Sequence, residues 1–263
     1  MEEALTFTDP AGHKVAGILA TPEEKTDRMA VLCHGFLSHK NSKTNQALTA
    51  LLPPQGIGTF RFDFFGQGES EGPFERITVS LAVWQALAGL DLMSSKGYRK
   101  LALVGSSFGG LVALLAAAQH PPIVCVALKC PVPDFPEMLN LEFGGTGMAQ
   151  WKATDTIPNV VPGGSGRIKL SYAFYEDSLC HNGFDAAKVI TAPTVIVQGA
   201  HDEYVPPRQI LKLSESLGGP NSVAWLPDAD HHFSRPEDFQ TMTTLLSNWV
   251  ADHLNGPYAF GFG

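Results

Sequence analysis

Short hydrophobic runs alternate with helix-length segments along most of the chain. Continuous apolar runs are typical of strands that are covered on both faces, and we expect such strands at residues 29–33, 57–62 and 101–104. Residues 123–128, 194–198 and 223–226 are three more strand candidates. Longer segments with few helix breakers predict helices at residues 78–95, 111–119, 206–217 and 236–254. Because strands and helices alternate through short connections, the pattern predicts an α/β fold with a mostly parallel, doubly wound sheet.

The N-terminus carries a different pattern. Two short strand-like runs, residues 5–8 and 15–20, flank Asp9, Pro10 and Gly12. Each of these three residue types favours turns, so the pattern predicts an antiparallel hairpin ahead of the parallel sheet.

One stretch, residues 131–187, interrupts the alternation. It is rich in Pro and Gly and carries scattered aromatic residues. A loop of this length without structure is unusual inside a compact domain, so we expect an insertion with structure of its own. We interpret it as a lid over a functional site, with a solvent-facing elaboration as the alternative. Residues 1–263 then form one domain, which ends in a flexible tail at residues 256–263.

Length and charge narrow the class of protein. The chain has 263 residues, with 18 Lys and Arg against 26 Asp and Glu, for a net charge of −8. Nucleic acids and anionic membrane surfaces require clustered positive charge, so we expect neither as a partner. No apolar run approaches the roughly 18 residues of a membrane-spanning helix. The opening Met-Glu-Glu-Ala lacks the basic and apolar regions of a signal peptide, which predicts a cytoplasmic protein.

The four cysteines, Cys33, Cys125, Cys130 and Cys180, do not predict a metal site. Cys33 and Cys125 lie within apolar runs, so we expect buried thiols in a chain without a secretion signal. A zinc site is the alternative, but it needs paired short spacings of Cys or His that the sequence does not contain.

The Gly-x-Ser-x-Gly pattern of residues 105–109 provides a candidate nucleophile, Ser107. The pattern directly follows one expected strand and precedes a helix. A serine in so sharp a turn has a strained backbone, and glycines two positions before and after it remove side chains that would clash. The turn lifts the hydroxyl above the sheet, near the positive end of the helix dipole. Ser106 lacks this glycine spacing, and an ordinary glycine-rich turn is the alternative.

A serine hydroxyl becomes a good nucleophile only when a base takes its proton, and imidazole suits this role at neutral pH. His231 and His232 follow the last expected strand, and Asp202 follows the strand before it. Because the carboxyl ends of parallel strands share one edge of the sheet, these residues can meet Ser107 there. We therefore expect Asp202 to orient the histidine. The sequence pattern alone leaves both His231 and His232 as candidates for the base.

Acyl transfer also requires N–H donors for the negatively charged oxygen of the tetrahedral intermediate. We expect one from Phe108, the residue after the nucleophile. The second is expected from the loop after residues 29–33, where Gly35 lets the Phe36 N–H face the site. His34 in the same loop is expected to be a structural hydrogen-bonding residue rather than the base.

Together these motifs resemble those of α/β-hydrolases, and the resemblance covers nearly the whole chain. Residues 34–36 are similar to the oxyanion loop of that family, residues 61–70 to its Asp-x-x-Gly-x-Gly-x-Ser loop, and residues 105–109, 199–206 and 229–233 to its nucleophile, acid and histidine loops. The resemblance implies an α/β-hydrolase fold with a lid, favours His231 over His232, and implies structural roles for Asp63 and Ser70. Within the family, the pattern is most similar to small esterases of the cinnamoyl (feruloyl) esterase and monoacylglycerol-lipase-like group.

The sequence thus predicts a serine carboxylester hydrolase that works through an acyl-enzyme and needs neither metal nor cofactor. The expected partner is a small-molecule ester, and we place an aromatic ester, such as a feruloyl ester, slightly ahead of one with a short-to-medium acyl chain. The expected walls of its pocket are Phe36, Trp151 and Tyr172. A serine peptidase or amidase of the same fold, or a non-catalytic ligand receptor, is the alternative. Whether the chain forms a homo-oligomer is left open.

Overall fold

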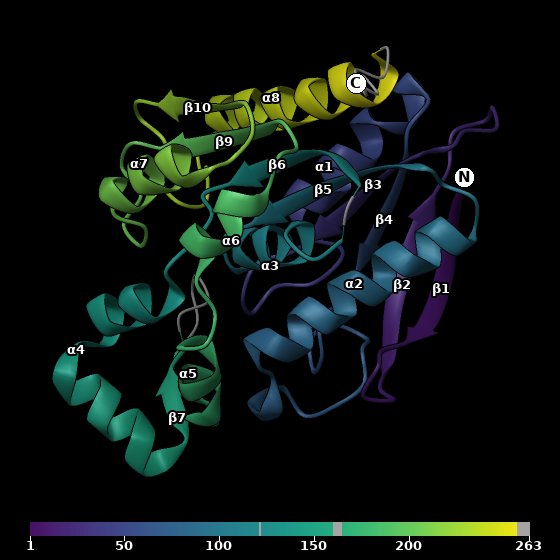
Figure 1. The fold of residues 1–263 in the computed structure, drawn as a ribbon. Coiled ribbons are helices and arrows are strands. Elements are labelled where there is room, and N and C mark those ends of the chain that lie inside the picture. Colours follow the sequence, from purple (N-terminus) through teal and green to yellow (C-terminus); the bar gives the residue numbers. More distant parts are fainter. Residues whose placement is uncertain (121, 160–164, 257–263) are drawn as a thin grey trace.

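The computed structural model describes residues 1–120, 122–159 and 165–256. The strands of its main sheet are β1 (Glu2–Thr8), β2 (Lys14–Ala20), β3 (Arg28–Cys33), β4 (Gly58–Phe62), β5 (Lys100–Ser106), β6 (Ile123–Lys129), β9 (Thr194–Gly199) and β10 (Asn221–Leu226). Their order across the sheet is β1-β2-β4-β3-β5-β6-β9-β10 (Figure 1). Every strand expected from the sequence is present, and β10, at the edge of the sheet, is the least buried of the parallel strands.

The antiparallel hairpin expected at the N-terminus is confirmed. β1 pairs antiparallel with β2, which also pairs antiparallel with β4. The other neighbouring strands of the main sheet pair in parallel. Asp9 holds the hairpin turn, because its carboxylate accepts the N–H groups of Ala11 and His13 at 2.9 and 3.0 Å.

Helices cover both faces of the main sheet (Figure 1). α1 (Lys43–Leu51) and α8 (Pro236–Asn255) lie on one face, and α2 (Val79–Ser95), α3 (Phe108–Ala117), α6 (Gly183–Val189) and α7 (Pro207–Ser216) lie on the other. Strand β3 supplies both cores by alternation: Met29 and Val31 pack on the side of α2 and α3, while Ala30 and Leu32 pack on the side of α1 and α8. Burial on both faces explains why the strands are continuous apolar runs.

Three of the expected helices match the structure closely. α2, α7 and α8 begin and end within one residue of the ranges expected from the sequence. α3 begins earlier than expected, at Phe108, because the helix starts directly after the turn at Ser107. α1 was not predicted, although Ser42 caps it by accepting the Asn45 N–H at 3.3 Å.

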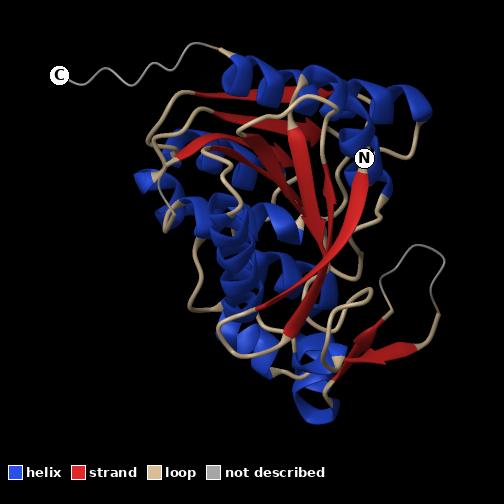
Figure 2. Cartoon of the chain, turned by 90° about the vertical axis from the view of Figure 1, so that its right-hand side faces the viewer, coloured by secondary structure: helices blue, strands red, loops and turns tan. Residues whose placement is uncertain are grey.

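Residues 131–187 contain α4 (Phe135–Thr154), α5 (Ala173–Ser178) and the start of α6. They also contain β7 (Thr156–Pro158) and β8 (Arg167–Lys169), which form an antiparallel pair apart from the main sheet (Figure 2). α4 is kinked at Gly144, whose φ of 58° and ψ of 175° are not helical. Of the tail expected at residues 256–263, all but Gly256 lies outside the described residues.

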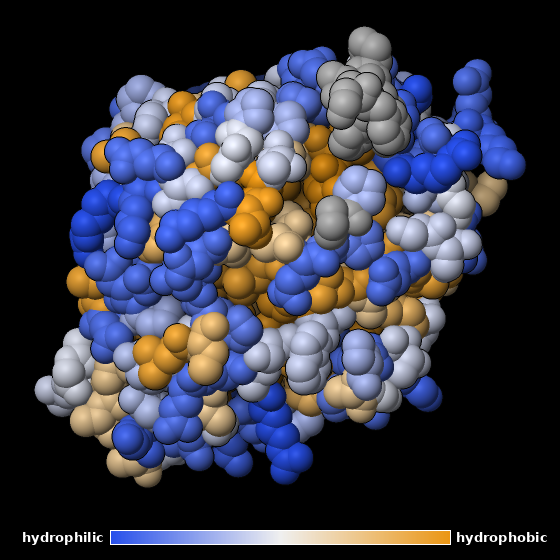
Figure 3. Space-filling view, viewed as in Figure 1, coloured by the Kyte–Doolittle hydropathy of each residue, from blue (hydrophilic) through white to orange (hydrophobic). Residues whose placement is uncertain are grey.

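The surface over α2 and α3 is partly apolar. Figure 3 shows hydrophobic residues gathered in the middle of this face, surrounded by mainly hydrophilic ones. The large apolar side chains that reach solvent include Trp84 of α2, which is 47% exposed. Within the described residues, no helix combines the length and the hydrophobicity that a membrane span requires.

Candidate active site

Ser107 lies in a sharp turn between β5 and α3. Its φ of 54° and ψ of −117° are rare for a residue other than glycine. Neighbouring backbone comes so close that a Cβ at Gly105 would lie 2.3 Å from the Gly109 carbonyl oxygen, and a Cβ at Gly109 would lie 2.3 Å from the Cys33 carbonyl oxygen. Only glycine fits at these two positions, so the Gly-x-Ser-x-Gly pattern is what allows the turn to form.

A chain of hydrogen bonds joins Ser107 to His231 and Asp202. The Ser107 Oγ lies 3.0 Å from Nε2 of His231, and Nδ1 of His231 lies 2.8 Å from Oδ2 of Asp202. The side chains of His231 and Asp202 are 6% and 2% exposed. His232 is exposed, and its ring packs edge-on against those of Tyr204 and His231. Of the two candidate histidines, the structure therefore brings His231 to the serine.

Asp202 is held as a carboxylate despite its burial. Burial disfavours the charged form, but the hydrogen bond and charge of His231 and the N–H groups of Val205 and Tyr204 outweigh it and lower the pKa of Asp202 to about 2. Both backbone N–H groups lie 2.9 Å from Oδ1, and Gln198 donates to Oδ2 at 2.7 Å. Because the carboxylate accepts so many donors, it fixes the imidazole without taking its proton.

Phe36 and Phe108, the two residues expected to supply N–H donors, lie close to Ser107 in the fold. Phe108 begins α3, where the first amides have no partner within the helix. The loop of Phe36 packs against the serine, since a Cβ at Gly35 would lie 3.6 Å from that of Ser107. Within the described residues, neither the Phe36 nor the Phe108 N–H has a hydrogen-bond acceptor. Both are therefore available to a negatively charged oxygen.

His34 orients one of these donors. Its ring is fully buried, and burial lowers the pKa of His34 to about 4, so the ring is neutral at pH 7. The Phe64 N–H donates to Nε2 at 3.0 Å, which leaves the proton on Nδ1, 2.8 Å from the Gly35 carbonyl oxygen. C=O and N–H point in opposite directions across a planar trans peptide, so holding the Gly35 oxygen also aims the Phe36 N–H. His34 is thus a structural residue, as expected.

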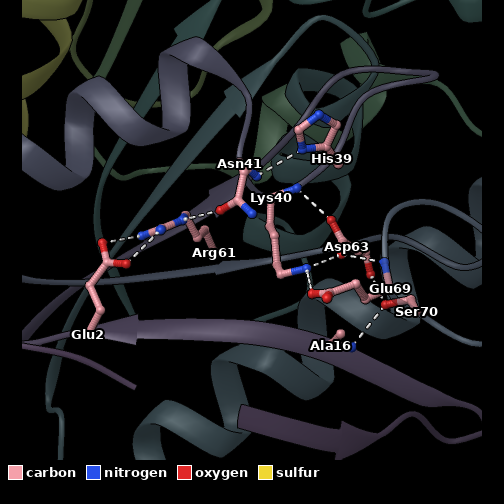
Figure 4. Close-up of polar contacts among 9 residues, drawn as sticks. All are labelled: Glu2, Ala16, His39, Lys40, Asn41, Arg61, Asp63, Glu69 and Ser70. Carbon is pink, nitrogen blue, oxygen red and sulfur yellow. Dashed lines mark hydrogen bonds and ion pairs between the residues drawn. The ribbon is translucent and has the colours of Figure 1, made fainter. Parts of the chain in front are cut away.

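A buried ion pair anchors the loop between β3 and α1, to which Phe36 and Lys40 belong (Figure 4). Nζ of Lys40 lies 2.6 Å from Oδ2 of Asp63 and also contacts the carboxylate of Glu69. Burial disfavours the ammonium, but the two carboxylates outweigh it and raise the pKa of Lys40. Ser70 donates to the Asp63 carbonyl oxygen and accepts the Ala16 N–H. Asp63 therefore holds Lys40 in place, Ser70 ties Asp63 to β2, and within the described residues neither forms a hydrogen bond with Ser107.

An apolar cavity of about 90 Å³ lies beside Ser107. Its apolar walls include Phe36, Val132, Phe135, Leu139, Phe143 and Ile157, most of them from residues 131–187. The expectation that Trp151 and Tyr172 line the pocket is wrong. Trp151 is fully buried within the segment, where its Nε1 donates to the Leu170 carbonyl oxygen at 2.7 Å and Tyr172 packs against its ring.

One cluster of potential metal ligands overlaps the same residues. Sγ of Cys130 and ligand atoms of Asp202 and His231 lie within 4.8 Å of one another. Burial raises the pKa of the Cys130 thiol far above its usual range, so it stays protonated, whereas a metal binds the thiolate. Asp202 and His231 are already hydrogen-bonded to each other, and His231 to Ser107, so we assign these side chains to the hydrogen-bonded chain rather than to a metal site. Cys33 and Cys125 are free, buried thiols, as expected from the sequence.

The family model for the alpha/beta hydrolase family matches residues 30–240, so the chain belongs to this family. Solved structures agree on the fold. A putative hydrolase from Agrobacterium vitis is 26% identical, with a TM-score of 0.84 over 95% of this chain and 99% of that one. Est1E from Butyrivibrio proteoclasticus, solved with ferulic acid bound, is 22% identical, with a TM-score of 0.84 over 96% of this chain and all of that one (100%).

Among curated proteins, the chain is similar to mitochondrial palmitoyl-protein thioesterase ABHD10 from Rattus norvegicus. The two are 22% identical over 222 residues, which cover 82% of this chain and 73% of that protein. The α/β-hydrolase fold expected from the sequence is confirmed.

We predict that Lys40→Met destabilises the protein by roughly 3–5 kcal/mol, because it leaves the buried Asp63 carboxylate without its cation. Urea unfolding measures the change. Lys43→Met removes an exposed lysine of the same stretch and should change the free energy of unfolding by less than about 0.5 kcal/mol. Equal effects of the two substitutions would show that the ion pair does not anchor the loop.

Proposed function

We propose that the protein is a serine hydrolase that cleaves carboxylic esters through an acyl-enzyme. The observation that carries this proposal is the hydrogen-bonded chain from Ser107 through His231 to Asp202, which ends on a serine held in a strained turn. Membership of the alpha/beta hydrolase family supports the same chemistry. A ligand receptor of this fold would not need a buried, ionised Asp202 behind a histidine.

In the first half of the reaction, Oγ of Ser107 attacks the ester carbonyl carbon while Nε2 of His231 accepts its proton. Negative charge develops on the carbonyl oxygen, and the N–H groups of Phe36 and Phe108 stabilise it. Asp202 keeps the Nδ1 proton in place and stabilises the imidazolium that forms. The bond to the leaving oxygen then breaks, His231 protonates that oxygen, and the acyl group stays on Ser107.

In the second half, a water molecule attacks the acyl-enzyme carbonyl carbon. His231 takes a proton from the water, and the same two N–H groups bind the negatively charged oxygen again. Collapse of the intermediate breaks the bond to Ser107, which recovers its proton from His231. The products are the free acid and the alcohol, and each proton that His231 accepts it also returns.

The apolar cavity is suited to the acyl group, and its volume bounds the size of that group. About 90 Å³ is less than the roughly 150 Å³ of an engineered apolar cavity that binds benzene. This small space favours a short aliphatic acyl chain over an aromatic ring such as that of a feruloyl group. We therefore place short acyl esters ahead of aromatic ones, which the sequence had slightly favoured.

Residues 131–187 act in this proposal as a cap over the acyl group. Phe135 of α4 and Phe174 of α5 pack against Phe36, with ring centroids 6.1 and 5.2 Å apart. The carboxylate of Asp177 in α5 accepts both the N–H and the hydroxyl of Ser80 in α2. These contacts fasten the segment to the rest of the domain, so in this proposal it shapes the acyl pocket as a fixed wall.

A fluorophosphonate probe tests the nucleophile and the base. We expect covalent labelling of the wild type and none of Ser107→Ala, because only that hydroxyl has an imidazole beside it. His231→Ala should slow labelling by orders of magnitude. Ser106→Ala and His232→Ala are the matched controls and should label readily. Mass spectrometry of the adduct reports the site, and an unlabelled wild type would favour the ligand receptor.

His34→Ala should lower kcat for p-nitrophenyl butyrate by on the order of 10- to 100-fold, because the Phe36 N–H loses its fixed direction. KM should change little, since the apolar cavity is intact. His34→Gln offers a donor and an acceptor and should recover part of the rate. Circular dichroism checks that each variant is folded. A rise in KM at unchanged kcat would contradict this role.

The acyl preference is measurable with p-nitrophenyl acetate, butyrate, octanoate and dodecanoate, together with methyl ferulate. We expect kcat/KM to peak at acetate or butyrate and to fall at least about tenfold for dodecanoate and methyl ferulate. Leu139→Ala enlarges the cavity and should move the peak to a longer chain. An aminoacyl p-nitroanilide tests the amidase alternative, and turnover of this amide above that of the esters would reject the proposed reaction.

A further inference from the structure

A second cavity adjoins Ser107, and it differs from the apolar one in size and polarity. Its volume is about 720 Å³, against about 90 Å³ for the apolar cavity. The two share Phe36, Ser107, His231 and His232 as lining residues, so they meet at the reacting hydroxyl. An ester bound across Ser107 therefore places one part of the molecule in each cavity.

A buried cation lines the larger cavity. Lys129 ends β6 and is 6% exposed. Its Nζ donates to the His231 carbonyl oxygen at 2.6 Å and lies 5.3 Å from the centre of the Phe233 ring. Within the described residues, no carboxylate forms an ion pair with it. Buried lysines without an acidic partner are uncommon in proteins, so Lys129 is a candidate to bind an anionic ligand in this cavity.

The start of α1 adds positive potential to the same cavity. Lys43 and His39 line it with exposed side chains, and Lys43 forms no ion pair within the described residues. The N–H groups of Lys43 and Thr44, in the first turn of α1, have no acceptor in the part of the chain that the structure describes. The positive end of a helix and its free N–H groups attract anions.

Acidic side chains stay out of this cavity, although the whole chain has a net charge of −8. None of the described residues that line it is Asp or Glu. The carboxylates of the neighbouring loops have other partners. Asp202 binds the His231 ring, Glu203 accepts the backbone N–H of His231, and Asp230 accepts the backbone N–H of Ser234. The apolar cavity, by contrast, includes Glu142, and none of the described residues that line it is Lys or Arg.

The two cavities thus suit different ends of an ester, because one is apolar and the other is lined by basic side chains. The acyl group remains covalently bound after the first half-reaction and fits the small apolar cavity, while the leaving group departs through the larger, polar one. We propose that the natural substrate carries an anionic leaving group, a carboxylate or phosphate bound by Lys43, Lys129 and the start of α1. This inference rests on the proposed serine hydrolase function.

Two matched pairs of butyryl substrates test it. One pair is the ester of 3-hydroxybenzoate against that of 3-hydroxybenzamide, and the other is the thioester of coenzyme A against that of N-acetylcysteamine. In each pair the leaving atom is the same type and only one member is anionic. We expect a higher kcat/KM for the anionic member of at least one pair. The pair that shows this preference identifies the anion as a carboxylate or as a phosphate. The ratio should fall as NaCl rises from about 20 to about 300 mM.

Lys43→Gln should lower the ratio of kcat/KM for the anionic over the neutral member by about two- to fivefold, since one exposed charge is removed. Lys96→Gln removes an exposed lysine at the end of α2, outside the cavity, and should leave the ratio unchanged. A ratio at or below one in both pairs, or one that neither salt nor Lys43→Gln alters, overturns the proposal.

Binding to Ser107→Ala separates this inference from the proposed reaction. Calorimetry compares 3-hydroxybenzoate with 3-hydroxybenzamide, and coenzyme A with N-acetylcysteamine, without any turnover. Tighter binding of an anion supports the site even if p-nitrophenyl butyrate is not hydrolysed, a result that would reject only the esterase function. Equal or weaker binding of both anions overturns the anion site, whatever the wild type does with neutral esters.

Discussion

The site depends on the close approach of two backbone turns, one after β3 and one after β5. The strands are parallel neighbours with Cys33 opposite Gly105, so their turns leave the sheet side by side. A Cβ at Gly109 would lie 2.3 and 2.4 Å from the carbonyl oxygens of Cys33 and His34. Because glycine occupies that point, the turns touch, and the loop of Phe36 lies against the strained serine. Without this contact, the loop that carries the Phe36 N–H would lie further from the Ser107 hydroxyl.

The buried charged side chains around this contact have different kinds of partner. The pair of Lys40 and Asp63 neutralises itself, and it serves only to hold a loop. Asp202 stays ionised because several donors converge on it, which leaves proton transfer to His231 alone. Lys129 contacts a carbonyl oxygen and an aromatic ring, and it forms no ion pair with a carboxylate of the described residues. Of these buried charges, it is therefore the one that still attracts an ion of opposite charge.

The sequence predicted the sheet and the positions around Ser107 because both follow from local rules. Buried strands are apolar runs, and the residues after β5, β9 and β10 emerge at one sheet edge, which brings Ser107, Asp202 and His231 together. The walls of the apolar cavity could not be predicted. The glycines of α4 obscured the helix that carries Phe135 and Leu139, and no periodicity tells whether Trp151 faces a ligand or its own segment. Lys129 ends an apolar strand, so its burial beside a cavity depended on tertiary packing alone.

In the proposed reaction, the two ends of a substrate lie against different parts of the chain. The acyl cavity is walled mainly by residues 131–187, whereas Lys43 and Lys129 of the polar cavity belong to the helix and strand framework. Changes in the segment can therefore alter the acyl preference while the framework keeps its preference for the leaving group. His231 is the point where the two meet, because it lines both cavities and its carbonyl oxygen binds Lys129. An anion near Lys129 would consequently act on the same loop that positions the proposed base, which couples leaving-group recognition to proton transfer.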